Sequence, residues 1–197
     1  MPFLRAILLV CLSSATIIGC SSTVKRDASS TAESAATHLD KPALVQLTLS
    51  AEGRKAAGKS LKFDADELKE TIERALKNQN LLADPDATDA YRVDVEITSV
   101  RVRSNFSAVA FGFMAGSDRI LGTVTARDSQ GRLINRFNVN ASYALGGLAG
   151  GMDQARTGWL YEKFAEETLI ELTSTERKPE KVCKRTHLGV QCRTAKN

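Results

Sequence analysis

The first twenty residues decide how much of this chain can fold as a domain. A basic residue, Arg5, precedes an apolar run over residues 6–12, and a small residue, Gly19, comes directly before Cys20. This order is typical of a bacterial lipoprotein signal, which is cleaved before the cysteine so that the thiol can carry acyl chains such as palmitate. The run is shorter than the roughly 20 residues of a membrane-spanning helix. We therefore predict that residues 1–19 are a signal peptide and that Cys20 is lipidated.

Two processing outcomes stay open. Cleavage after Gly19 would leave an acylated Cys20, whereas ordinary secretion with cleavage near the preceding serines would leave a plain thiol. The residue after the cysteine is Ser21 rather than Asp, which resembles lipoproteins that a Gram-negative cell releases to its outer membrane. We expect a protein of the bacterial cell envelope, anchored to a membrane through its N-terminal lipid, at the outer membrane and facing the periplasm.

Two further cysteines belong to the mature chain. Cys183 and Cys192 form an even pair with eight residues between them, which in an oxidising periplasm predicts a disulfide closing a small loop. A zinc site is the alternative, but zinc prefers four ligands and nearby only His187 could join the two thiols. We predict the disulfide, and neither a metal nor another cofactor.

Composition divides the processed chain into three parts. Residues 20–41 are rich in Ser, Thr and Ala without apolar periodicity, which predicts a flexible linker behind the lipidated cysteine. Residues 42–175 have the length of a single domain. Residues 176–197 form a basic tail that could contact anionic lipid headgroups or an acidic partner, or could be a solvated end. Nucleic acid is not an expected partner, because of the compartment and because this tail has no aromatic residue.

The first half of the domain predicts a strand and a helix. Residues 43–49 contain alternating apolar and polar side chains, as a strand does, and the stretch 53–59 predicts a loop. A helix then starts at Asp64, which can cap it. Glu67 can bond back to complete a capping box, and Phe63 can pack on Leu68 as a hydrophobic staple.

The second half is dominated by strands. Residues 91–103 alternate with a slip in phase at Thr98–Ser99, where a β-bulge would restore the apolar face. Residues 120–127 and 133–143 predict a hairpin around a turn at Asp128, and an amphipathic helix starts near Asp153. The predicted fold class is α+β: a four-stranded, mainly antiparallel sheet with two helices on one face, in the order strand, helix, three strands, helix.

Two connecting segments are unusually apolar and rich in glycine. They cover residues 107–116 and 144–152, and in a meander of three strands both would lie at the end of the sheet opposite the Asp128 turn. Exposed apolar patches usually mark a partner or membrane surface, although these segments could instead fold back on the core. The residues that we expect to contact a partner or membrane are Phe111, Phe113, Met114, Leu145, Gly147, Leu148 and Gly151.

Catalysis has little support in the sequence. Residues 42–175 contain no His and no Cys, which excludes histidine-based triads, cysteine nucleophiles and the usual zinc chemistry within them. The chain has no phosphate-binding loop and no dinucleotide fingerprint. Acidic residues are present, but we expect Asp94, Glu96, Asp118 and Asp128 on the outer face of strands or in turns, and Arg103 also facing outward. We predict no catalytic residues.

The order of these features resembles a known family. The features are, in chain order, the cysteine signal, the polar linker, a strand and an amphipathic helix, a strand leading to Ala115–Gly116–Ser117, the strand with Asp128–Arg132, the glycine-rich segment and the closing helix. Together they are similar to the bacterial lipoproteins with domain of unknown function forty-four ten. The resemblance covers roughly residues 42–172. It implies a periplasmic α/β domain without an established activity.

These inferences lead to a function that is not enzymatic. We predict an envelope lipoprotein that binds another envelope protein through its apolar segments, as an accessory subunit of a membrane-associated complex. The alternative is a periplasmic carrier of a small ligand or lipid, with a pocket between helices and sheet. That pocket would be lined by Phe63, Ile72, Leu76, Phe137 and Tyr143.

Overall fold

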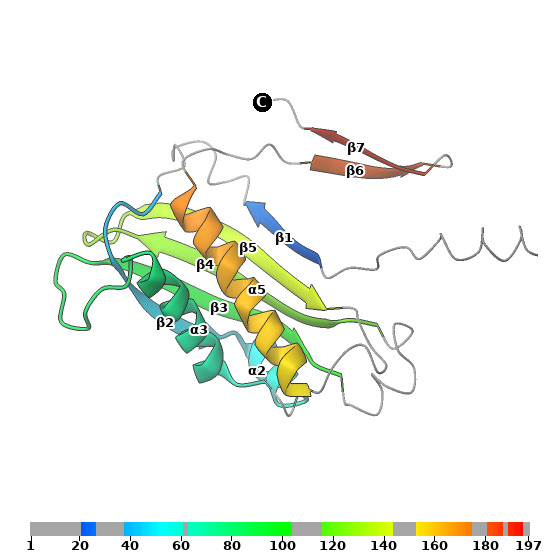
Figure 1. Ribbon diagram of the computed structural model, residues 1–197, viewed down its shortest axis with the longest axis horizontal. Helices are drawn as coiled ribbons and strands as arrows, with labels where there is room; N and C mark the ends of the chain where they lie inside the picture. Colours follow the sequence, from blue (N-terminus) through cyan, green and yellow to red (C-terminus); the bar gives the residue numbers. More distant parts are fainter. Residues whose placement is uncertain are drawn as a thin grey trace, which may run out of the picture.

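A five-stranded sheet with two helices on one face forms the main body of the protein (Figure 1). The computed structural model describes residues 21–26, 38–60, 63–103, 116–143, 153–174, 181–186 and 189–194. In chain order the elements are β1 (Ser21–Arg26), β2 (Ala43–Leu49), α2 (Ala51–Ala57), α3 (Ala65–Asn78), β3 (Tyr91–Arg101), β4 (Asp118–Arg127), β5 (Leu133–Tyr143), α5 (Asp153–Thr173), β6 (Lys181–Thr186) and β7 (Gly189–Thr194).

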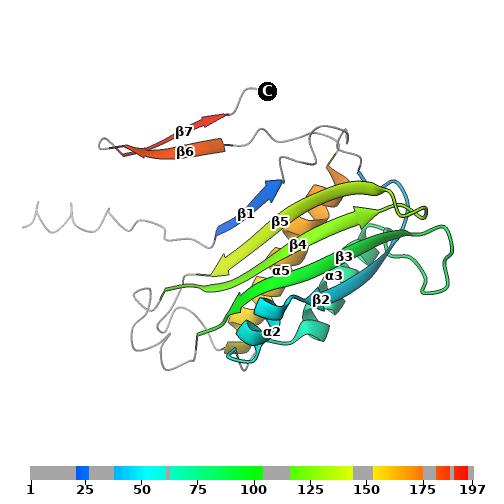
Figure 2. The same cartoon turned by 180° about the vertical axis from the view of Figure 1, so that it is seen from behind.

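The main sheet has the strand order β1-β5-β4-β3-β2 and is mixed. β3, β4 and β5 form the predicted antiparallel meander, β1 adds antiparallel to β5, and β2 pairs parallel with β3. α3 and α5 pack together on one face, and in the view from behind no described helix crosses β3, β4 and β5 on the other face (Figure 2). The α+β class is confirmed, but the prediction of four strands and two helices is wrong in detail, because β1 and α2 are additional.

The additional strand corrects the predicted linker. We expected residues 20–41 to be flexible, but residues 21–26 pair with β5 from Ser21 opposite Ser142 to Arg26 opposite Phe137. Val24 packs against the core, and the hydroxyl of Ser22 donates to Glu167 of α5 over 2.5 Å. The strand covers an edge of β5 that would otherwise expose unpaired backbone groups.

The additional helix α2 lies where we predicted a loop. Ser50 caps it by accepting a hydrogen bond from the backbone N–H of Gly53 over 3.0 Å. A Cβ atom at Gly53 would lie 2.1 Å from the carbonyl oxygen of Ile97. The glycine therefore allows α2 to pack tightly against β3, and it does not break the chain into a loop.

The start of α3 confirms one half of the predicted capping box. The Asp64 side chain accepts hydrogen bonds from the backbone N–H groups of Asp66 and Glu67, over 2.9 and 3.1 Å. The backbone N–H of Asp64 itself donates to the hydroxyl of Tyr161 over 2.8 Å, in the place that we expected Glu67 to fill. Phe63 packs edge-on against the same tyrosine, with ring centroids 6.0 Å apart. A residue of α5 thus completes the cap of α3.

The predicted bulge in β3 is confirmed. The register with β4 shifts between Ile97 and Ser99, so that Ile97 and Val100 are both buried while Arg101 is exposed. The hairpin of β4 and β5 also forms as predicted, around a turn in which Gly131 has a φ of 81°. Local alternation of side chains was therefore a reliable guide to the meander.

The interior beneath the helices is closely packed. Ile72, Leu76 and Phe137, which we assigned to the pocket of the alternative carrier function, are each at most 1% exposed. Phe63 and Tyr143 pack against the same core at its margin. These side chains hold the helices on the sheet, so their assignment to a ligand pocket finds no support in the described part of the chain.

The C-terminal tail contains a two-stranded hairpin, β6 and β7. Its register places Cys183 directly opposite Cys192. Directly opposed residues of an antiparallel pair have Cα atoms about 4.5–5.5 Å apart, which is within the range that a disulfide requires. The predicted disulfide remains a prediction, and the backbone pairing is compatible with it.

Candidate functional site

One end of the main sheet collects the attachment points of both apolar segments. We call it the loop end and define it by Arg101 of β3, Asp118 of β4, Tyr143 of β5 and Ser21 of β1, which the strand register brings to the same end. The first apolar segment is attached between β3 and β4, and the second between β5 and α5. The expectation that these strand ends meet opposite the Asp128 turn is confirmed.

The predicted contact residues themselves lie outside the described residues. These are Phe111, Phe113, Met114, Leu145, Gly147, Leu148 and Gly151, and the predicted lipidation site Cys20 is also outside. The structure describes the residues to which the segments are attached. The site is therefore built from those residues.

A buried cluster of three charged residues joins the ends of the first segment. Asp118 is 0% exposed. It lies between Arg103, which is 5% exposed, and Arg156, which is 1% exposed. Its Oδ1 accepts from the Arg103 backbone N–H over 2.7 Å and from Nε over 3.1 Å, and its Oδ2 accepts from Nη2 over 3.2 Å. The Nε atom of Arg156 forms an ion pair with Oδ2 over 3.1 Å.

Further hydrogen bonds extend this cluster into a clamp. Nη1 of Arg103 donates to the carbonyl oxygen of Gly116 over 2.6 Å, and Nη2 of Arg156 donates to the carbonyl oxygen of Arg103 over 2.9 Å. Arg103 lies four residues before the first segment begins, Gly116 is the last residue of that segment, and Arg156 lies in the first turn of α5. The clamp thus holds the chain just before the first segment, the end of that segment and the helix that follows the second.

Two sequence expectations are wrong at this clamp, since we placed both Arg103 and Asp118 on the outside. Asp118 is two residues before Ile120 in a strand whose buried positions alternate, so its parity alone could have revealed that it faces inward. Arg103 has no such signal. It lies two residues beyond the end of β3, and only the tertiary contacts turn it inward.

The clamp is suited to holding structure and poorly placed for catalysis. A carboxylate that is fully buried and bonded to guanidinium groups cannot reach a substrate in solvent. Burying charges is favourable only when every partner is present, so removal of one partner costs about 3–5 kcal/mol. Within the described ranges, no group of His, Cys, Asp and Glu is arranged to hold a metal ion.

An aromatic pair lies at the attachment points of the second segment. Tyr143, the last residue of β5, packs on Trp159 of α5 with ring centroids 5.1 Å apart and an interplanar angle of 52°. Both rings are half-buried. The strand before the segment and the helix after it are thus joined by side-chain packing, as the clamp joins the ends of the first segment.

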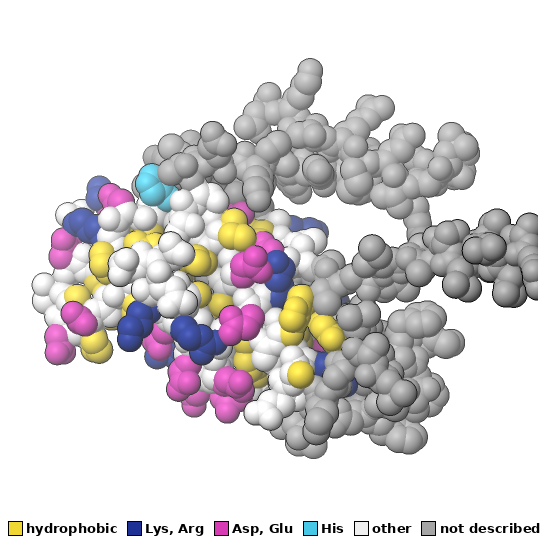
Figure 3. Space-filling view, in the orientation of Figure 1, with side chains coloured by type: hydrophobic (Ala, Val, Ile, Leu, Met, Phe, Trp, Pro, Cys, Tyr) yellow, Lys and Arg dark blue, Asp and Glu magenta, His cyan; other side chains and the backbone are white. Residues whose placement is uncertain are grey.

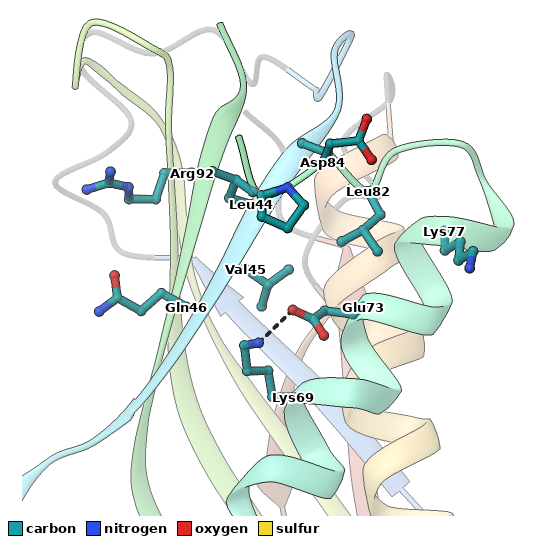
Figure 4. A pocket seen from close by; sticks show the side chains of 11 residues that line it. Leu44, Val45, Gln46, Lys69, Glu73, Lys77, Leu82, Asp84 and Arg92 are labelled. Atoms are coloured by element: carbon teal, nitrogen blue, oxygen red, sulfur yellow. Dashed lines mark ion pairs between the residues drawn. The ribbon is translucent and has the colours of Figure 1, made fainter. Parts of the chain in front are cut away.

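A separate cavity of about 690 Å³ lies between β2 and α3. Two of its charged side chains, Lys69 and Glu73, are paired with each other by an ion pair 2.8 Å long (Figure 4). Arg92 and Gln46 point away from α3. This cavity holds mixed charges and no convergent set of catalytic groups, and it is lined by none of the residues predicted for a carrier pocket.

The helix-covered surface is mixed in polarity. Figure 3 shows acidic and basic side chains interspersed over it, and ion pairs such as Arg74–Glu162 and Lys163–Glu166 contribute to this pattern. Of the large hydrophobic residues in the described part, Leu133 is the exposed one, at 43%. No helix of that part is both long enough and apolar enough to cross a membrane.

Comparison with known proteins identifies a domain family. The family model described as "Domain of unknown function (DUF4410)" matches residues 23–147, so the match begins inside β1. A PelC dodecamer from Paraburkholderia phytofirmans is similar at 13% identity, over 78% of this chain and 99% of that chain, with a TM-score of 0.45. A minor lipoprotein from Acinetobacter baumannii is similar at 17% identity, over 68% of this chain and 94% of that chain, with a TM-score of 0.39. No curated protein sequence matches the chain.

Proposed function

This chain belongs to the DUF4410 domain family, and from that premise we propose that it is a lipid-anchored envelope lipoprotein that binds another envelope protein beside the membrane. The binding is not enzymatic, because residues 42–175 contain neither His nor Cys and carry no nucleotide-binding motif. The outer membrane is the proposed location, because the residue after Cys20 is serine.

The pairing of β1 with β5 is the observation that supports this proposal most directly. Ser21, the residue next to Cys20, lies opposite Ser142 at the loop end. Consecutive Cα atoms are 3.80 Å apart, so an acyl group on Cys20 would be attached about one residue from the sheet. A membrane that received those chains would lie next to the loop end and next to the attachment points of both apolar segments.

Partner binding is proposed for the two apolar segments. Their composition is unusual for connections between strands, since loops are normally polar where they run over a surface. The described surface offers few exposed large hydrophobic side chains, so an apolar interface would have to draw on these segments. The clamp of Arg103, Asp118 and Arg156 would then fix where the first segment begins and ends.

Site-specific cross-linking in native membranes tests the proposal. A photo-reactive amino acid at Phe111 or Phe113 is expected to capture a defined envelope protein. The same group at Gln130, an exposed residue of the turn at the opposite end, is expected to capture none. Equal capture from both ends would contradict partner binding by the apolar segments.

Mass spectrometry of the mature N-terminus tests the anchor separately. We expect the chain to begin at Cys20 with acyl groups attached. An unmodified thiol there would contradict lipid anchoring even if the cross-linking succeeded.

A further inference from the structure

A second cavity, of about 430 Å³, lies at the loop end between α2 and the last residues of β3, and it is rich in positive charge. Four basic residues line it: Lys55 of α2, Lys59 just after that helix, Arg101 of β3 and Arg119 of β4. All four are exposed, and Glu52 is the acidic residue among the lining side chains. The charge of this cavity suits an anion.

The bulge in β3 and the strand register create this concentration of charge. After the shift between Ile97 and Ser99, Arg101 is exposed and lies directly opposite Arg119 on the neighbouring strand. Two positive charges are therefore held next to each other at one side of the cavity, where a single anion could contact both guanidinium groups.

The same register row leads to the proposed lipid attachment site. Arg101 is opposite Arg119, Arg119 is opposite Ser142, and Ser142 is opposite Ser21. Neighbouring strands are about 4.8 Å apart, so three steps place Ser21 about 14 Å from Arg101 across the sheet. The residue that follows Cys20 therefore lies at the same level of the sheet as the two arginines.

We propose that this cavity binds the phosphate of an anionic phospholipid headgroup in the membrane to which Cys20 is anchored. This inference rests on the proposed lipid anchor, because the anchor would bring the leaflet to the loop end. The headgroup would complement the four basic side chains. Two contacts, the acyl chains and the headgroup, would then limit rotation of the domain on the membrane.

The location of the charge favours a lipid over a free anion. Exposed basic side chains bind small anions weakly in water, because solvent and salt screen them. Close to an anionic leaflet, each such side chain increases binding about fivefold. A cavity at the end of the sheet that carries the anchor is well placed to gain from that effect.

The test uses the mature chain purified from membranes in detergent. Its binding to dihexanoyl-phosphatidylglycerol, dihexanoyl-phosphatidylcholine and inorganic phosphate is measured at constant ionic strength. We expect the phosphatidylglycerol to bind at least about tenfold more tightly than either of the others, since it combines an anionic headgroup with acyl chains. The double variant Arg101→Gln/Arg119→Gln is expected to weaken that binding about thirtyfold.

A matched control comes from the opposite end of the same two strands. Arg92 and Arg127 are also a register pair of exposed arginines on β3 and β4. The double variant Arg92→Gln/Arg127→Gln is expected to bind the phosphatidylglycerol within about twofold of the unsubstituted chain, because it leaves the cavity intact. Thermal unfolding of each variant checks that it folds. If the double variant Arg101→Gln/Arg119→Gln does not fold, the single variant Arg119→Gln is used instead, and its affinity for the phosphatidylglycerol is expected to fall about fivefold.

Three results would overturn the proposal: equal losses in the two double variants, equal binding of phosphatidylcholine, or inorganic phosphate binding as tightly as the lipid. The last would assign the cavity to a free anion. The N-terminal mass of the same sample reports acylation independently. Failure of the anchor and failure of the headgroup site are therefore separate outcomes.

Discussion

Arg103 and Asp118 are joined by three hydrogen bonds across the attachment points of the first apolar segment, one from the backbone N–H of Arg103 and two from its guanidinium. The contact ties a residue just after β3, four positions before the segment begins, to the first residue of β4. Because both side chains are buried, neither can exchange its partner for water without cost. The position of the loop end thus depends on buried charges, in a domain whose other large, fully buried side chains are mostly apolar.

Replacing Asp118 by Asn should therefore destabilise the domain by about 3–5 kcal/mol, since it leaves two buried guanidinium groups without their carboxylate. Denaturant unfolding measures this loss. Asp86→Asn, at an exposed loop position, serves as the control and should change the free energy of unfolding by less than about 0.5 kcal/mol. Similar losses in the two variants would show that the clamp contributes no special stability.

Replacing Tyr161 by Phe should cost about 1 kcal/mol at neutral pH, because the backbone N–H of Asp64 loses its acceptor. The substitution should also change the response to alkali. Burial raises the pKa of Tyr161 from 10.0 to about 12, and the nearby Glu67 and Asp64 charges act in the same direction.

The sign of the alkaline effect follows from this raised pKa. The contribution of Tyr161 is fully present below pH 10, where the unfolded chain holds the proton, and it is lost as the pH rises to about 12. The free energy of unfolding should fall by about 2 kcal/mol more over that range in the unsubstituted chain than in Tyr161→Phe. If the free energy of unfolding fell by the same amount between pH 10 and 12 in both proteins, the raised pKa of Tyr161 would be contradicted.

Gly53→Ala should destabilise the domain by about 1–3 kcal/mol, because the added Cβ would lie 2.1 Å from the carbonyl oxygen of Ile97 and force α2 away from β3. Gly58→Ala is the matched control at the end of the same helix. Its nearest neighbour would be 3.5 Å away and its φ is −61°, so the change should be neutral or stabilising by up to about 1 kcal/mol. Thermal unfolding of both variants distinguishes the two effects, and the expectation fails if Gly53→Ala is as stable as Gly58→Ala.

Proline in β1 should release that strand from β5. In an antiparallel pair, every second backbone N–H of a strand points toward its partner. Of the two separate variants Thr23→Pro and Val24→Pro, one therefore removes a hydrogen bond between β1 and β5. In that variant the amides of β5 that face β1 should exchange hydrogen faster, while α3 remains protected. Unchanged exchange in both variants would mean that β1 does not pair with β5 in solution.

Cys183 and Cys192 should be oxidised in protein taken from the envelope. A maleimide should label neither residue before reduction and both after it, and Cys183→Ser should leave Cys192 open to labelling without reduction. A disulfide that closes a loop of this size should stabilise the hairpin locally by about 3 kcal/mol. Labelling of both thiols in the untreated protein would rule the bond out.

The sequence by itself determined the elements whose pattern is local. Alternation along β3, β4 and β5 placed the meander, the phase slip located the bulge, and Asp64 marked the start of α3. Each of these follows from the period of a strand or from hydrogen bonds to the next few residues. The same locality let the pattern show that both apolar segments are attached at one end of the sheet.

Only the tertiary structure decided the features that depend on distant partners. Residues 21–26 are polar and would not form a strand alone, but β5 offers them an unpaired edge more than a hundred positions later in the chain. Gly53 lies in a helix that packs closely on Ile97, which its missing Cβ allows, and Arg103 turns inward because Asp118 and Arg156 meet it there. Side-chain period reports which face of an element is apolar. It does not report which other element supplies the missing hydrogen bond or charge.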